Sequence, residues 1–429
     1  MQYCPRQPTK KPIRSLMMST KLSTNWEIGP IFRAMLRNKV GALLIAIQIA
    51  VTMTIIVNAV FIIVERNQQM HRESGIDEAN SFYLSSLGFT ANFNAQVTVQ
   101  EDLAMLRALP GVVDAVQINA IPLSGSGWSM GLQTQAGAQY DGVGTAVYMV
   151  DEHGVNALDV KIIAGENFSA TDITWRETGQ TSWPDKIIIT QAMAQKLFPD
   201  EGWQSALGKT VYINDIEPMV ISGIIDKLQA PWVGWDNVEN VMLSPERINS
   251  KSSRYFIRTQ PGQRDALMVD IEERLATSNK GRIIKSMQSI DESRERAYRG
   301  NTAMIKILST VMVILTIVTG LGIVGLASFS VNSRKKQIGT RRALGASQGA
   351  IVRYFMLENF LISSIGVVLG AILTIALNMV LVNTFSLDPI SWFYIPIGMV
   401  ILWLVGQIAV FGPAKKAANI APAIATRTV

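Results

Sequence analysis

The sequence predicts a membrane protein that joins a bundle of four spanning helices to a large α+β domain outside the membrane. The 429 residues are 48% apolar and only 17% charged, too apolar for one soluble domain and too polar for a purely membrane-embedded bundle. Four apolar runs are long enough to cross a bilayer, since a helix needs about 20 apolar residues to span about 30 Å. Ordinary globular composition separates the first run from the second, over about 240 residues.

The expected segments follow one another in a simple order. They are a cytoplasmic tail with an interfacial helix (1–39), a first span (40–64), an outside domain (65–302), a second span (303–330), a cytoplasmic segment (331–355), a third span (356–382), a fourth span (393–411) and a cytoplasmic tail (412–429). The interfacial helix is predicted between Trp26 and Asn38, where apolar residues fall on one side of a helix. The first span is too long for a signal peptide, so we expect an uncleaved anchor.

Charge predicts which side of the membrane each segment faces, because cytoplasmic flanks are rich in Lys and Arg. Residues 1–39 contain eight basic residues and one acid, and residues 331–353 contain six basic residues and no acid. Residues 65–330 contain 22 basic and 30 acidic residues. We therefore expect both termini in the cytoplasm and the large domain outside. The net charge of +6 sums two opposite surfaces, so we expect no nucleic acid partner.

The outside domain shows the same order of elements near both of its ends. Strand, helix and strand are predicted at 82–89, 99–109 and 112–121, and again at 254–259, 263–277 and 282–287. Two such units around an insertion at about 122–251, which has a mostly β pattern, predict a split α+β sandwich. Charged helices at 65–80 and 289–302 are expected to connect this domain to the membrane, the second as a stalk.

Two motif-like stretches lack the context that their chemistry requires. Residues 127–131 fit the G-x-S-x-G pattern of serine hydrolases around Ser129, but no helix pattern follows and His153 is the only later His. We interpret this stretch as a glycine-rich loop. Residues 207–210 resemble the end of a phosphate loop, but Trp203 stands where its first glycine is required. We therefore expect no catalytic, cofactor or metal site in these 429 residues.

The cytoplasmic segment after the second span has more detail than a loop that needs only positive charge. A basic stretch passes into Ala-Leu-Gly-Ala at 343–346 and then into an amphipathic, finally apolar helix. Attraction to anionic membrane lipids explains the basic residues but not the small ones, which let a helix sit closely in a groove. We therefore expect another protein to bind this segment.

Two further patterns concern packing and contacts. Gly366 and Gly370 allow two helices to approach closely, within one subunit or between two. Most Trp residues of the insertion are explained by core packing, but the loop-like stretch around Trp232 and Trp235 is a candidate contact for a partner outside the membrane. The expected spans contain no acid near the membrane midplane, which argues against a proton- or ion-coupled carrier.

The stretch 337–347, followed by Ile-Val-Arg at 351–353 and Leu-Glu at 357–358, resembles the MacB/FtsX family of ABC transporter permeases. The tail at 413–423 resembles the closing segment of that family. A third likeness, to the MacB-type periplasmic core, covers residues 187–190, 192–198, 206–209 and 220–226. The chain departs from the family at Gln337, where Glu is usual, and we expect no fused nucleotide-binding domain.

The resemblance implies an architecture and a set of partners. It implies a permease dimer in the bacterial inner membrane, with a periplasmic domain made of a porter-like part (about 80–121 and 252–288) and an inserted Sabre-type part. It also implies a separate ABC ATPase subunit that holds ATP and Mg²⁺, a periplasmic adaptor and an outer-membrane channel. The residues expected to contact the ATPase are Gln337, Ile338, Gly339, Arg341, Arg342, Ala343, Leu344, Gly345, Ala346 and Ser347.

For such a permease the resemblance implies mechanotransmission, in which ATP-driven closure moves the periplasmic domain, and efflux is the expected role. Lipoprotein release and control of cell-wall hydrolases are alternatives within the same superfamily. A ligand-sensing membrane receptor is an alternative from another class, although four spans and the lack of a cytoplasmic output domain argue against it. A membrane serine hydrolase would depend on Ser129.

Overall fold

The computed structural model describes residues 39–385 and 389–422. The interfacial helix expected between Trp26 and Asn38 lies outside these residues, as does residue 423 of the closing segment. Among the described residues, four helices are long and apolar enough to cross a membrane, as the sequence predicts. They are α2 (Lys39–Met70), α8 (Arg299–Ser333), α10 (Gln348–Phe385) and α11 (Tyr394–Ala418).

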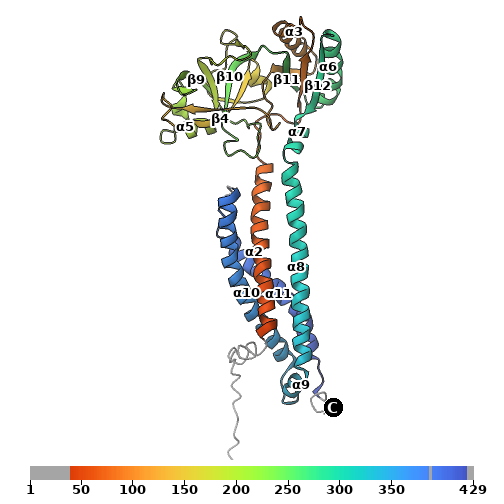
Figure 1. Cartoon of the computed structure of the whole chain (residues 1–429). Coiled ribbons are helices and arrows are strands. Elements are labelled where there is room, and N and C mark those ends of the chain that lie inside the picture. Colours follow the sequence, from red (N-terminus) through yellow and green to blue (C-terminus); the bar gives the residue numbers. More distant parts are fainter. Residues whose placement is uncertain (1–38, 386–388, 423–429) are drawn as a thin grey trace, which may run out of the picture. The chain divides into compact units, whose positions relative to one another are not determined.

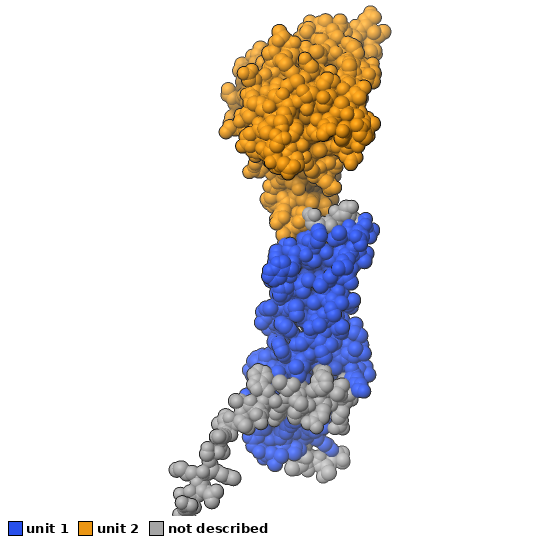
Figure 2. Space-filling view, turned by 90° about the vertical axis from the view of Figure 1, so that its left-hand side faces the viewer, with its two compact units in different colours: residues 1–61, 310–429 blue, residues 62–309 orange. Residues whose placement is uncertain are grey.

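The chain forms two compact units, coloured separately in Figure 2: residues 1–61 with 310–429, and residues 62–309. In the first unit, the spanning helices pack around apolar residues of α2, α8, α10 and α11. Gly366 and Gly370 of α10 lie directly against α2: an added Cβ would come within 2.7 Å of the Ala46 carbonyl oxygen at Gly366 and within 2.8 Å of Met53 Cβ at Gly370. These two glycines therefore serve packing within the chain.

The second unit contains, within the described residues, a four-stranded antiparallel sheet in the order β12, β1, β11, β2. Its elements are β1 (Ser81–Gly88), α3 (Ala95–Arg107), β2 (Val112–Gln117), β11 (Ser252–Thr259), α6 (Arg264–Ser278) and β12 (Arg282–Ser289). The α+β class and the repeated order of strand, helix and strand are confirmed. Figure 1 shows α3 and α6 beside this sheet.

Both faces of this sheet are buried, because alternate residues of each strand point to opposite faces. Tyr255 and Ile257 of β11 join the cluster that α3 and α6 cover, whereas Phe256 between them joins the core shared with the inserted part. A buried ion pair adds to the helical side: the Arg282 guanidinium contacts the Asp102 carboxylate, which also accepts a 2.7 Å hydrogen bond from the Tyr255 hydroxyl. Burial, with the Asp102 charge, raises the pKa of Tyr255 well above its usual range.

The insertion folds as a mostly β body, as expected. Its elements are β3 (Trp128–Gln133), β4 (Val143–Val150), α4 (Gly154–Ala157), β5 (Ile162–Gly165), β6 (Thr174–Arg176), β7 (Lys186–Thr190), α5 (Gln191–Leu197), η1 (Trp203–Ala206), β8 (Thr210–Ile213), β9 (Glu217–Ile225) and β10 (Val241–Ile248). The pairing runs β4, β3, β8, β9, β7, β10 and returns to β4, so the strands close into a barrel. Closure pairs strand edges that would otherwise be exposed to other chains.

Three local expectations are wrong. The helix expected at 65–80 ends at Met70, because Gly75 adopts φ +85° and the chain packs there against the Lys227 backbone. The charged helix expected at 289–302 is interrupted at Tyr298, between α7 (Ile290–Ala297) and α8. The stretch around Ser129, expected as a glycine-rich loop, is strand β3, which pairs with both β4 and β8.

Candidate functional site

The segment predicted to face the cytoplasm and bind a partner forms a short helix, α9 (Lys335–Ala343), and a tight turn. The turn has the hydrogen bonds of a Schellman motif: the Gly345 amide donates to the Arg342 carbonyl at 3.1 Å, and the Ala346 amide donates to the Arg341 carbonyl at 3.0 Å. Gly345 has φ +96°, a conformation that a residue with a Cβ rarely adopts. The glycine in Ala-Leu-Gly-Ala is therefore the end signal of α9.

The next helix starts two residues later. The Ser347 side chain accepts a 3.2 Å hydrogen bond from the Ala350 amide, which is the N-cap contact expected from a Ser at this position. Helix α10 therefore begins at Gln348, well before the third apolar run. At the corner between α9 and α10, the amides of Gly345 and Ala346 hydrogen-bond the last carbonyls of α9, and the Ser347 side chain accepts a hydrogen bond from an amide at the start of α10.

One side of α9 is anchored in the bundle. Ile338 is buried with apolar residues of the neighbouring helices, which are Val331, Ile351, Phe355, Ala414, Ala417 and Ala418. Arg334 Nη1 contacts both carboxylate oxygens of the buried Glu358, at 2.9 and 3.0 Å. The Arg341 guanidinium lies over the ring of Tyr354, 4.8 Å from its centroid. These contacts hold α9 to α8, α10 and α11.

The predicted partner-binding residues therefore divide into three groups by exposure. Ile338 and Gly339 are buried and position the helix, while Arg342 and Ala346 are half-buried. The remaining six are exposed: Gln337, Arg341, Ala343, Leu344, Gly345 and Ser347. Leu344 is 84% exposed, the largest value among the exposed large apolar side chains of the described residues. Single exposed apolar side chains are common on protein surfaces, so Leu344 identifies a candidate contact only together with the exposed predicted residues beside it.

In the second unit, Trp232 and Trp235 lie edge to face, with ring centroids 5.6 Å apart. Both are half-buried and pack against the core of the unit. Together with Ser129 and Gly234 they line a hollow of about 340 Å³. Gly144 leaves room for the Trp235 ring, since an added Cβ would lie 3.1 Å from Trp235 Cζ2. A contact of these rings with a partner stays a prediction.

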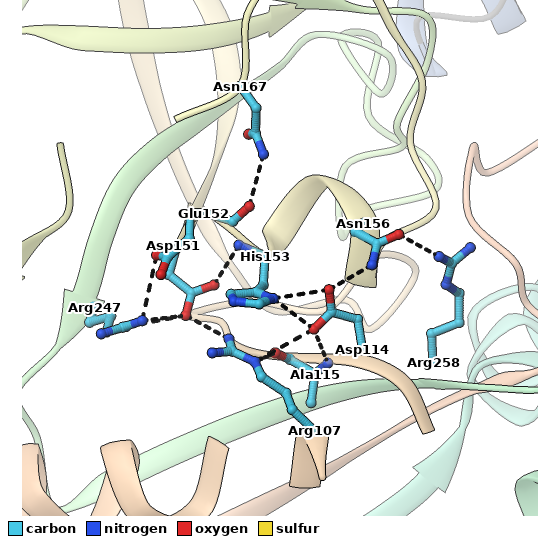
Figure 3. Close-up of polar contacts among 10 residues, drawn as sticks. All are labelled: Arg107, Asp114, Ala115, Asp151, Glu152, His153, Asn156, Asn167, Arg247 and Arg258. Atoms are coloured by element: carbon cyan, nitrogen blue, oxygen red, sulfur yellow. Dashed lines mark hydrogen bonds and ion pairs between the residues drawn. The ribbon is translucent and has the colours of Figure 1, made fainter. Parts of the chain in front are cut away.

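A polar network that the sequence did not reveal joins the two parts of this unit (Figure 3). At its centre is Asp151, whose side chain is fully buried at the end of β4. Its carboxylate accepts hydrogen bonds from Arg107 Nη2 of α3 at 2.8 Å and from Arg247 Nη2 of β10 at 2.9 Å. Arg107 also donates to the Ala115 carbonyl at 2.8 Å. One carboxylate thus ties the four-stranded sheet and its helix to the barrel.

The same network continues through α4. Asp114 of β2 accepts hydrogen bonds from Asn156 Nδ2 at 2.7 Å and contacts His153 Nδ1 at 3.0 Å. Asn156 in turn accepts from Arg258 Nη2 of β11 at 2.8 Å, as Figure 3 shows. Since charge-assisted hydrogen bonds of low exposure resist competition from water, the two parts are held as one body.

Over the described residues, the geometry defines a protein with four helices able to span a membrane, a short exposed helix between two of them, and a mixed α+β domain. Two family models match it: MacB-like periplasmic core domain over residues 41–274, and FtsX-like permease C-terminal over residues 309–422. The chain belongs to the MacB/FtsX family of ABC transporter permeases.

Individual relatives agree with this assignment. The chain is 26% identical over 352 residues to a Pasteurella multocida protein named macrolide export ATP-binding/permease protein MacB, covering 77% of this chain and 48% of the relative. A Chromobacterium violaceum protein of the same name is 24% identical over 278 residues, covering 61% of this chain and 40% of the relative. The chain thus spans less than half the length of these curated relatives.

Among solved structures, the periplasmic region of MacB from Actinobacillus actinomycetemcomitans is 14% identical, with a TM-score of 0.32, over 53% of this chain and 97% of that chain. The extracellular domain of the ABC-type transporter YknZ from Gram-positive bacteria is 15% identical, with a TM-score of 0.30, over 48% of this chain and 100% of that chain.

The α9 turn gives a prediction with a matched control. Gly345→Ala is expected to destabilise the end of α9 by about 1–2 kcal/mol, because the left-handed backbone would carry a Cβ. An added Cβ meets no described atom within 4 Å at either Gly345 or Gly349, but only Gly345 has a positive φ. Amide hydrogen exchange over residues 335–346 should accelerate about fivefold to thirtyfold in Gly345→Ala. Gly349→Ala should leave it unchanged, and equal effects of the two changes would refute the backbone argument.

The network in Figure 3 gives a second prediction. Asp151→Ala is expected to lower the free energy of unfolding of the second unit by about 3 kcal/mol, because it removes the buried carboxylate that Arg107 and Arg247 share and leaves them, among carboxylates, only 3.5 Å contacts to Asp114 and Glu152. Urea unfolding of the full chain in detergent, followed by Trp fluorescence, measures this change. The control Asp270→Ala, which removes an exposed pair with Arg274, should cost about 0.5 kcal/mol or less. Similar midpoints for both variants would contradict the proposed role of Asp151.

Proposed function

We propose that this chain is the membrane subunit through which a separate ABC ATPase moves a periplasmic domain, and that the complex carries out efflux. The ATPase binds α9 and the turn after it, and supplies the ATP and Mg²⁺ chemistry. The chain pairs with a second permease in the bacterial inner membrane, with both termini in the cytoplasm. A periplasmic adaptor and an outer-membrane channel complete the transport path.

The observation on which the proposal depends is the exposed surface of α9. Leu344 is exposed at the end of a helix whose last turn contains Arg341 and Arg342. A large apolar side chain ringed by charged ones has the composition of an interface anchor, which gains affinity when a partner pocket removes it from water. The basic residues add attraction to an acidic partner surface and speed association.

The anchoring of α9 supports its role in transmission. Arg334, directly before α9, is paired with the buried Glu358 of α10, and Ile338 is packed among α8, α10 and α11. A displacement imposed on α9 therefore reaches the spanning helices without first deforming a flexible loop. Because packed helices move as units, a small shift at α9 is passed on as a shift of whole helices.

The relatives support the assignment of direction and energy source. Their printed name combines ATP binding, permease and export in one chain, and the residues matched here cover less than half of that chain. The family models matched by this sequence are a periplasmic core and a permease domain. The name of these relatives and the permease family models support the proposal of an ABC ATPase as energy source and of export as direction.

The prediction is that Leu344→Glu reduces the amount of ABC ATPase that copurifies with the full chain about tenfold or more, because it replaces the apolar anchor with a charge. Quantitative mass spectrometry after purification from native membranes in mild detergent measures it. Val269→Glu is the matched control, since Val269 of α6 is also exposed (70%) but belongs to the other unit.

Copurification of the ATPase at the same level with Leu344→Glu would show that this residue is not its anchor. If the unaltered chain retains no ATPase at all, the proposed function itself fails. The other copurified proteins also discriminate: an adaptor supports efflux, whereas a lipoprotein or a cell-wall hydrolase would favour the alternatives within the superfamily. A ligand response without any ATPase would favour a receptor.

A further inference from the structure

The neck of the second unit is the stretch 71–80, between the end of α2 and the start of β1. Helix α2 ends at Met70, so its last carbonyl groups have no partner within the helix. Arg294 belongs to α7, which connects β12 to α8, and its side chain hydrogen-bonds two carbonyls here. Its Nη1 donates to the Met70 carbonyl and its Nη2 to the Arg72 carbonyl, each at 2.8 Å.

The same guanidinium also binds Glu78 at the far end of the neck. Arg294 Nε donates to Glu78 Oε2 at 2.6 Å, and Nη2 donates to Oε1 at 2.8 Å, which is a bidentate pair. Burial acts against the charged form of Arg294, but the hydrogen bonds and charge of Glu78 outweigh it and raise the pKa of Arg294. All three guanidinium nitrogens thus donate: Nη1 to the end of α2, Nε to Glu78, and Nη2 to both Glu78 and the Arg72 carbonyl.

The neck is also fixed to the barrel. The Gln229 amide donates to the Ser74 carbonyl at 2.9 Å, and Lys227 forms an ion pair with Glu73. At Gly75, an added Cβ would lie 2.2 Å from the Lys227 carbonyl oxygen, so the two backbones are in direct contact. Motion of the end of α2 therefore reaches the barrel through the neck. Motion of α7 and α8 reaches the end of α2 through Arg294, while Arg264, which bonds both Asp291 and the Ala79 carbonyl, connects α7 to the other end of the neck.

We propose that Arg294 is a positioning residue that locks the end of α2 to the start of α8, so that the two spanning helices drive the second unit together. This inference rests on the proposed function, because locking matters only if the helices transmit movement. Arginine suits the task because its planar fork reaches two carbonyls and a carboxylate at once. Lysine keeps the charge but lacks the planar fork. Arg294→Lys should therefore keep few of the contacts that hold α2 to α8.

The first experiment needs no partner. Spin labels at Gln68→Cys and Ala303→Cys, in a Cys4→Ser background, report the distance between α2 and α8 in the full chain in lipid nanodiscs. Both positions are exposed and belong to the second unit. We expect one narrow distance distribution in the unaltered protein. In Arg294→Gln the fraction of molecules at a longer distance should rise about tenfold, because several charge-assisted hydrogen bonds are lost.

Two other variants make the result specific. Glu78→Gln removes the bidentate pair but keeps the carbonyl contacts, so its effect should be intermediate. Arg258→Gln is the matched control, because Arg258 also bonds side chains within the unit but contacts neither α2, α7 nor α8. An unchanged distribution in Arg294→Gln and Glu78→Gln overturns the inference, as does equal broadening in Arg258→Gln.

The second experiment uses the complex with its copurified ATPase. Arg294→Gln should keep the ATP hydrolysis rate within about twofold while it reduces substrate exported per ATP about tenfold, since α9 is untouched and only transmission is lost. Loss of hydrolysis and export in equal proportion would indicate a merely structural role and refute the inference. Absence of an ATPase would refute the proposed function. The distance measurement would still test whether Arg294 holds the end of α2 to the start of α8.

Discussion

Every feature of this chain that matters for its function follows from one constraint, the need to satisfy backbone hydrogen bonds where water is absent. In hydrocarbon a single spanning segment can satisfy its own backbone groups as a helix. The four spanning helices of 25 to 38 residues meet this need. The chain ends a helix only where other groups take over: at α9 the amides of Gly345 and Ala346 bond the last carbonyls, and at Met70 the Arg294 guanidinium does.

Hydropathy predicted the spanning helices well, because it reports directly on the surrounding solvent. Their ends were predicted less well, since an apolar run marks where a helix meets lipid and not where its hydrogen bonds stop. Thus α10 starts at Gln348, where Ser347 caps it, although the apolar run begins at Met356. The helix predicted at 65–80 stops early because Gly75 packs against a distant backbone, a contact that no local pattern records.

The second unit shows the same limit more strongly. Its α+β class could be predicted from repeated local patterns, but strand β3 was taken for a loop because of its glycines. Tertiary pairing overrides that preference: Gly131 faces Gly144 across the β3–β4 pair, where small residues allow close approach. The network around Asp151 was invisible for a related reason. Arg107, Asp151 and Arg247 are far apart in sequence and meet only because β4 pairs with β10.

The side-chain exposure of the ion-paired residues shows which contacts of this domain are most open to water. Inside it, the carboxylate of Asp151 and the guanidinium of Arg282 are fully buried, so water does not compete for their partners. At the neck, the side chains of Arg294 and Glu78 are 22% and 21% exposed. Water and salt weaken an accessible pair more than a buried one. The Arg294–Glu78 pair of the neck is therefore more open to water than the Arg282–Asp102 pair inside the domain.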